Sequence, residues 1–150
     1  MSPGTGTIPH HAMLACEPFS ERLDAARVAA ALASGLAADG SPAPDSVLLP
    51  EGAGSHDTAA LLQREDFHAR MLASRAVIIA VPALAERTLE GSAAFEIATL
   101  ARQSGVPCYA AAAAVELNTF DLRILDLQMV VRARGEAGLR TAGEKLAGVI

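Results

Sequence analysis

Five short apolar runs alternate along the chain with segments whose apolar residues recur at helical spacing. The runs are continuous, without regular alternation of apolar and polar residues, and they span residues 12–16, 47–50, 76–81, 106–113 and 129–131. A continuous apolar run of this length predicts a strand that is buried on both faces, which is typical of a parallel sheet.

Helices are predicted between these strands, because apolar residues recur there every three or four positions. The first helix is expected to begin after Asp24, whose side chain can cap a helix N-terminus, and to end at residues 39–42, which include a glycine and a proline. The other helices are expected over about 57–72, from Ser92 to Gly105, over 118–125, and across a final apolar stripe of Leu139, Ala142, Leu146 and Val149.

Strands that alternate with helices, and that are buried on both faces, predict a doubly wound α/β architecture. We therefore expect a single Rossmann-like domain of three layers, with a mostly parallel sheet of about five strands. The length of 150 residues agrees with one domain. We assign residues 1–11 to a flexible N-terminal tail and residues 12–150 to the domain. Aromatic residues make up only 3% of the chain, so the core is expected to consist of Ala, Val, Leu and Ile.

The charge of the chain narrows the classes of partner. A net charge of −5 argues against nucleic-acid binding and against an anionic membrane surface, since both require clustered Lys and Arg. Residues 1–11 lack the basic and apolar regions of a secretory signal, and no apolar run approaches the ~20 residues of a membrane-spanning helix. We expect a cytoplasmic protein with no nucleic-acid or membrane partner.

Cysteine and histidine positions indicate no metal site. Cys16 and Cys108 each lie in or beside an apolar strand, which predicts buried, reduced thiols in preference to a disulfide. The four histidines show no zinc-like spacing with either cysteine, so neither a metal nor a resident cofactor is expected. Ser20 and Ser55 match no nucleophile-elbow pattern, and hydrolase chemistry is therefore not supported.

Polar residues gather in the segments that follow the predicted strands. In doubly wound sheets ligands bind at the carboxyl ends of the strands, so these segments are the candidate ligand site. In this hypothesis Arg22 or Arg87 pairs with a ligand carboxylate; the alternative is that all these residues are ordinary solvated loop residues and caps. The candidate ligand-binding residues are Glu17, Ser20, Arg22, Gly52, Gly54, Ser55, His56, Glu86, Arg87 and Glu116.

The glycine-containing segment 52–55 allows two interpretations. Its backbone N–H groups precede a predicted helix and could face an anion. It lacks the spacing and the lysine of a phosphate-binding loop, so a plain strand-to-helix turn is the competing interpretation.

The order of several motifs carries a resemblance to a known family. Residues 15–25 read Ala-Cys-Glu-Pro-Phe-Ser-Glu-Arg-Leu-Asp-Ala and are followed by Val28-Ala29. Further along, Thr88-Leu89-Glu90-Gly91 precedes a helix and Gly105-Val106-Pro107 precedes a strand. In this order the chain resembles bacterial glycerate kinases over most of residues 12–150. The resemblance implies an α/β fold, ATP and magnesium as the phosphoryl donor, and glycerate as the acceptor.

The chain departs from that family where the chemistry would lie. The family's lysine positions are Ser20 and Ser92 here, and its Gly-Glu-Gly-Arg-Leu-Asp motif is replaced by residues 80–85, Ala-Val-Pro-Ala-Leu-Ala. The family's second, inserted domain would fall between about Gln63 and Ser74 and is absent. Phosphoryl transfer depends on cations that neutralise phosphate charge and on a positioned carboxylate. We therefore expect no catalytic residue in this chain.

Three functions stay open on these grounds. The first is a non-catalytic glycerate-kinase-like protein that acts by binding a small ligand, such as a hydroxy acid, or a protein. The second is a glycerate kinase that needs a separate partner domain, with ATP and magnesium as cofactors. The third is a structural or regulatory partner of another protein.

The alanine-rich segment 25–33 predicts self-association. Its side chains are small or apolar nearly all round, and such a helix is usually buried on more than one side. We expect this helix or the C-terminal helix to pack against a second subunit in a homodimer.

Overall fold

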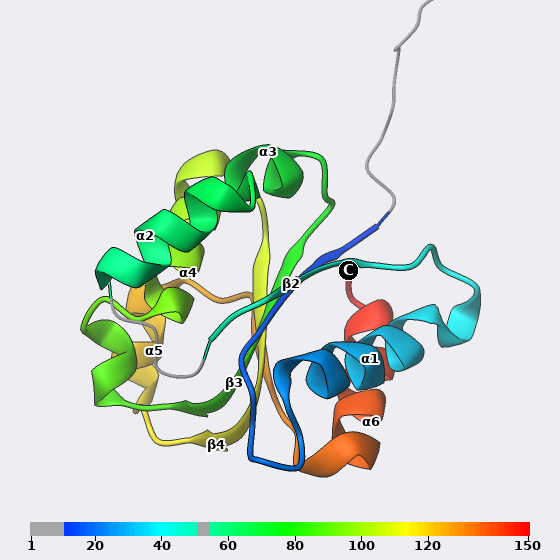
Figure 1. Ribbon diagram of the computed structural model, residues 1–150. Helices are drawn as coiled ribbons and strands as arrows, with labels where there is room; N and C mark the ends of the chain where they lie inside the picture. The colour runs from blue at the N-terminus through cyan, green and yellow to red at the C-terminus, as the bar shows by residue number, and fades with distance from the viewer. Residues whose placement is uncertain (1–10, 51–54) are drawn as a thin grey trace, which may run out of the picture.

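The sheet is five-stranded and entirely parallel, with the strand order β2-β1-β3-β4-β5 (Figure 1). The computed structural model describes residues 11–50 and 55–150; the predicted tail, up to residue 10, lies outside them. The order is that of flavodoxin-like folds, in which β1 and β3 flank the point where the chain reverses its direction across the sheet. The predicted doubly wound α/β fold is confirmed. The strands are β1 Met13–Cys16, β2 Asp45–Leu48, β3 Val77–Leu84, β4 Cys108–Val115 and β5 Met129–Arg132.

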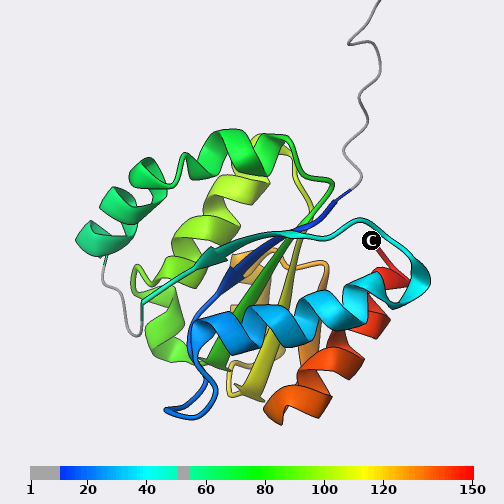
Figure 2. The same cartoon turned by 45° about the vertical axis from the view of Figure 1, so that its right-hand side comes forward.

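Helices cover both faces of the sheet, which gives three layers (Figure 2). One face carries α1 (Ala25–Leu36) and α6 (Gly135–Ala147). The other face carries α2 (Ser55–Arg64), α3 (Phe67–Leu72), α4 (Ala93–Ser104) and α5 (Thr119–Leu125). Two short 3₁₀ helices, η1 (Ala37–Asp39) and η2 (Glu86–Leu89), follow α1 and β3.

Each central strand contributes to both cores, because successive side chains of a strand point to opposite faces. In β3, Val77 and Ile79 belong to the core beneath α2–α5, whereas Ile78 and Ala80 belong to the core beneath α1 and α6. The apolar run of β3 is therefore continuous because the strand is buried on both faces, as predicted.

Capping side chains and a terminating glycine lie at the expected ends of three helices. The Asp24 carboxylate accepts a hydrogen bond from the Arg27 N–H at 2.9 Å, and the Asn118 side chain accepts one from the Asp121 N–H at 2.8 Å. Gly105 ends α4 with a φ of 72°, in the left-handed region that glycine enters without strain.

Helices α1 and α6 lie against each other at very short range. A Cβ added to Gly35 would stand 2.0 Å from the carbonyl oxygen of Arg140, and one added to Gly143 would stand 2.4 Å from that of Leu32. The small residues of α1 thus allow backbone-to-backbone contact within the chain. This contact accounts for the second buried side of the alanine-rich helix, which was the ground for expecting a subunit interface there.

The predicted helix over 57–72 is wrong, because the structure divides it into α2 and α3. Asp66 adopts φ 52° and ψ 42°, a left-handed conformation that aspartate tolerates better than most residues. The break lets Arg70 on α3 reach Asp45 at the start of β2, with nitrogen–oxygen distances of 2.9 and 2.6 Å.

Several boundaries also differ from the prediction. Strand β4 covers Cys108–Val115, whereas the sequence predicted residues 106–113. Strand β2 begins at Asp45, two residues before the predicted start, and Val149 lies beyond α6 with 47% of its surface exposed. The expected proline turn after Val81 is absent, since β3 continues through Pro82 to Leu84. The Glu17 N–H, just after the end of β1, donates to the Ala80 carbonyl of β3. Pro82 lies two residues further along β3, where β1 no longer runs beside it. A proline there removes no ladder hydrogen bond.

Candidate functional site

Six of the candidate ligand residues lie within the described chain at the carboxyl end of the strands, as parallel strands require. Glu17, Ser20 and Arg22 follow β1, Glu86 and Arg87 follow β3, and Glu116 follows β4. The Glu116 N–H donates to the Leu84 carbonyl at 2.8 Å, so the segment after β4 lies directly beside the end of β3. Whether these residues bind a ligand stays a prediction.

The hydroxyl groups at the carboxyl end of the strands form hydrogen bonds with nearby backbone groups. The Ser20 hydroxyl accepts a hydrogen bond from the Leu23 N–H at 3.2 Å. The buried Thr88 hydroxyl accepts one from the Ala85 N–H at 3.0 Å. The Ser92 hydroxyl donates to the Thr88 carbonyl at 2.7 Å and accepts from the Phe95 N–H at 3.1 Å. Thr88 and Leu89 of the Thr-Leu-x-Gly segment therefore belong to η2, and Ser92, directly after Gly91, caps α4, so these residues have structural roles that need no ligand.

The charged candidate residues at the carboxyl end of the strands are mostly exposed to solvent. Arg22, Glu86, Arg87 and Glu116 are exposed, and Glu17 is half-buried. Within residues 11–50 and 55–150, neither Arg22 nor Arg87 forms an ion pair. Both guanidinium groups are thus available to an anion, but nothing in the described part of the chain holds them in a fixed geometry.

The structure describes the remaining candidate ligand residues only in part. Gly52 and Gly54 lie outside the described residues, as does Glu51. Ser55 and His56 begin α2, and their side chains are not among those described.

Titratable groups with a shifted pKa lie where packing or a turn explains the shift. Burial raises the pKa of the Cys16 and Cys108 thiols to about 12, which keeps both protonated and unreactive. The Arg70 hydrogen bonds lower the pKa of Asp45, and those of Ser41 lower that of Asp39. These shifts have structural causes and do not mark a prepared acid, base or nucleophile.

The described residues contain no group of three or more His, Cys, Asp or Glu side chains that could hold a metal ion. Among the helices of the described ranges, none has the length and apolar character needed to cross a membrane.

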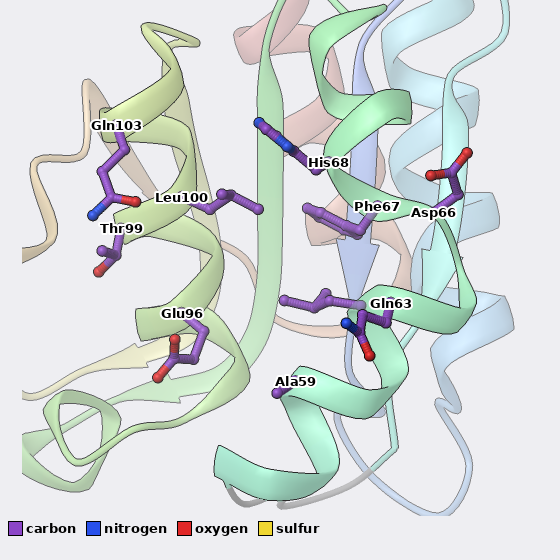
Figure 3. Close-up of a pocket in the computed structure, with 10 residues that line it drawn as sticks. Ala59, Gln63, Asp66, Phe67, His68, Glu96, Thr99, Leu100 and Gln103 are labelled. Carbon is purple, nitrogen blue, oxygen red and sulfur yellow. The ribbon is translucent and has the colours of Figure 1, made fainter.

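A groove that the sequence did not predict runs between α2–α3 and α4, with a volume of about 480 Å³ (Figure 3). Phe67 and His68 point from α3 toward Leu100 on α4, while Asp66 points away from α4. Among the residues that the structure describes, no lysine or arginine lines it. The lining residues are Ala59, Leu62, Gln63, Asp66, Phe67, His68, Glu96, Thr99, Leu100 and Gln103.

The groove combines an apolar interior with a few polar groups. Leu62 and Leu100 are half-buried and Phe67 is fully buried, whereas Gln63 and Gln103 are exposed at its margins. One His68 ring nitrogen, Nε2, lies 3.2 Å from the Ser104 hydroxyl, which links α3 to the end of α4. The groove exists because α2 and α3 change direction at Asp66, a conformation that no residue spacing indicated.

Comparison with known proteins finds no matching family model, no matching curated protein and no matching solved structure.

Proposed function

We propose that this protein acts by binding a small ligand without catalysing a reaction, and that the groove between α2–α3 and α4 is the binding site. The groove's volume of about 480 Å³ supports this proposal, because it lies within the range of about 300–1,000 Å³ that small-molecule sites occupy. An apolar interior with a few polar groups at its margin is also the usual composition of such sites.

The composition of the groove defines the chemical class of the ligand. The half-buried Leu62 and Leu100 offer apolar contact, and Gln63 and Gln103 offer hydrogen bonds. A phosphate or carboxylate group would find no lysine or arginine among the described lining residues. The expected ligand is a mostly apolar small molecule with one neutral hydrogen-bonding end, such as an amide or an alcohol.

A pair of neighbouring alanines tests this proposal. Ala59 lines the groove and is exposed, so the substitution Ala59→Trp is expected to fill the groove without disturbing the core. Ala60 is also exposed but does not line the groove, so Ala60→Trp is the matched control. A panel of small amides and alcohols, screened by ligand-observed NMR, should give binders that Ala59→Trp loses and Ala60→Trp keeps. Equal binding to both variants, or no binder in the panel, would contradict the proposal.

A glycerate kinase that needs a separate partner domain is the second candidate function. The break between α2 and α3 supports it, because Asp66 lies within residues 63–74, where the resemblance implies the missing domain. In that case glycerate, ATP and magnesium would bind near Arg22 and Arg87, which lack an ion-pair partner in the described part of the chain. Thermal stabilisation by glycerate or by ATP with magnesium, unaffected by Ala59→Trp, would favour this candidate.

The other expectations from the sequence belong to the same proposal. We infer that the protein binds no nucleic acid, on the basis of its net charge of −5. The cytoplasmic location stays a prediction. A homodimer through α1 or α6 would have to use their outer surfaces, because their facing surfaces are in contact with each other.

A further inference from the structure

Three of the six large apolar side chains that are exposed in the described residues lie on α5 and β5. Phe120 is 75% exposed, Ile124 is 45% exposed and Met129 is 38% exposed. Phe120 and Ile124 are four residues apart, so they occupy the same face of α5. Phe120 and Ile124 thus form an exposed apolar pair on α5, and exposed apolar surface of this kind indicates an interaction site.

The two edges of the sheet differ in how they are protected. At the β2 edge, the Arg70 guanidinium donates to the Ser46 carbonyl at 3.2 Å and pairs with the Asp45 carboxylate. At the β5 edge, no side chain in the described ranges donates to or accepts from the backbone of residues 129–132. An edge strand with free backbone groups and apolar neighbours can pair with another strand.

Charges flank β5 in a self-complementary order. Asp126 precedes the strand, and Arg132 and Arg134 lie at and after its end; all three are exposed. If two copies of β5 pair antiparallel, the start of each strand lies beside the end of the other. Asp126 of one copy then faces the arginines of its partner, whereas a parallel pair would place like charges together.

We propose that two copies of this chain associate through β5 and α5, with the β5 strands antiparallel about a two-fold axis. The pairing joins the two five-stranded sheets into one continuous sheet. An axis perpendicular to the sheet keeps both α5 helices, with the exposed Phe120 and Ile124, on the same face of the joined sheet. This interface is separate from the groove and from the α1–α6 contact, and it does not depend on the proposed ligand.

Charge reversal at the strand end tests the interface. The double variant Arg132→Glu and Arg134→Glu places two acidic groups opposite each Asp126 of the dimer, and should weaken dimerisation by about tenfold or more. Arg102→Glu with Arg140→Glu makes the same charge change at two exposed arginines of α4 and α6, and should leave the dimer intact. Sedimentation equilibrium of the full chain over a range of concentrations measures both.

Two further measurements keep the test independent of folding defects. Phe120→Glu alters a side chain that is 75% exposed, so it should yield a folded monomer with an unchanged circular dichroism spectrum. In the wild-type chain, hydrogen exchange of the β5 amides should slow as protein concentration rises. A wild-type chain that stays monomeric at every concentration would overturn the proposal, and so would a dimer that survives both the Arg132/Arg134 and the Phe120 variants.

Discussion

At the scale of single residues, the ion pair between Asp45 and Arg70 is the best-defined polar contact in the described chain. Two hydrogen bonds of 2.9 and 2.6 Å join the guanidinium to the carboxylate, and Glu65 adds a third contact at 3.2 Å. The Asp45 side chain is 29% exposed and that of Arg70 28%, so solvent screens the pair only in part. The pair fixes α3 to the β2 edge of the sheet.

This ion pair should make stability depend on pH. Hydrogen bonds from Arg70 lower the pKa of Asp45, so its contribution to stability is complete above the unfolded pKa of about 3.9 and is lost as pH falls through the lower folded value. Asp45→Asn should therefore lower the free energy of unfolding by about 1–2 kcal/mol at pH 7. Its difference from wild type should shrink in acid. Urea unfolding at a series of pH values measures both.

Glu136→Gln is the control for that measurement. Glu136 pairs with Arg27 at 3.5 Å, and the two side chains are 51% and 64% exposed. An exposed pair of this kind contributes little, so the substitution should change stability by less than about 0.5 kcal/mol at any pH. If Asp45→Asn behaved in the same way, the ion pair would have no structural role.

Whether the sequence could predict a side-chain contact depends on how far apart the two residues are in the chain. The caps Asp24 and Asn118 act on N–H groups three residues away, so their roles could be read from the sequence. Asp45 and Arg70 are 25 residues apart, and no local pattern links them. Their contact depends on the left-handed turn at Asp66, which brings α3 to the sheet edge.

At the scale of secondary-structure elements, the contact between α1 and α6 is the closest packing in the fold. The expected apolar stripe of α6 is present, with Leu139, Ala142 and Leu146 buried. The stripe predicted that α6 is buried on one face, but not which element covers it. Gly35 and Gly143 decide the partner, because only residues without a Cβ allow these two backbones to approach so closely.

Alanine substitutions in α6 should separate this contact from helix propensity. Gly143→Ala places a methyl group 2.4 Å from the Leu32 carbonyl and should lower the free energy of unfolding by about 1–3 kcal/mol. Gly138→Ala meets no atom closer than 3.5 Å, and alanine favours a helix by up to about 1 kcal/mol over glycine. Gly138→Ala should therefore be neutral or stabilising. Thermal unfolding of both variants checks the prediction, which equal destabilisation would contradict.

At the scale of the whole molecule, a single sheet lies between two hydrophobic cores and contributes side chains to both. Cys16 lies in the core beneath α1 and α6, and Cys108 lies in the core beneath α2–α5. Because β1, β3 and β4 supply side chains to both cores, loss of one helical layer exposes strands on which the other layer depends. We expect the domain to unfold in a single cooperative transition.

The two thiols can report on the two cores separately. Both are buried with a pKa raised to about 12, so neither should react with a thiol reagent at pH 8 in the folded protein. The single variants Cys108→Ala and Cys16→Ala each leave one thiol as a probe. Once the stability change of each variant is measured by circular dichroism, each thiol should become reactive at the same urea concentration as the global transition. Earlier exposure of Cys108 would show that the α2–α5 layer opens on its own.

The sequence alone supports the number of strands, the burial of β1, β3 and β4 on both faces, most helix positions and the caps, because each depends on residues that are close together in the chain. The predicted burial on both faces is wrong for the edge strands β2 and β5, since Leu48 is 47% exposed and Met129 is 38% exposed. It also placed the candidate ligand residues at one edge, since that follows from the strands being parallel. The strand order, the α1–α6 contact, the Asp45–Arg70 pair and the groove depend on tertiary packing. Each joins residues separated by tens of positions, and the fold brings them together through contacts that leave no periodic signal in the sequence.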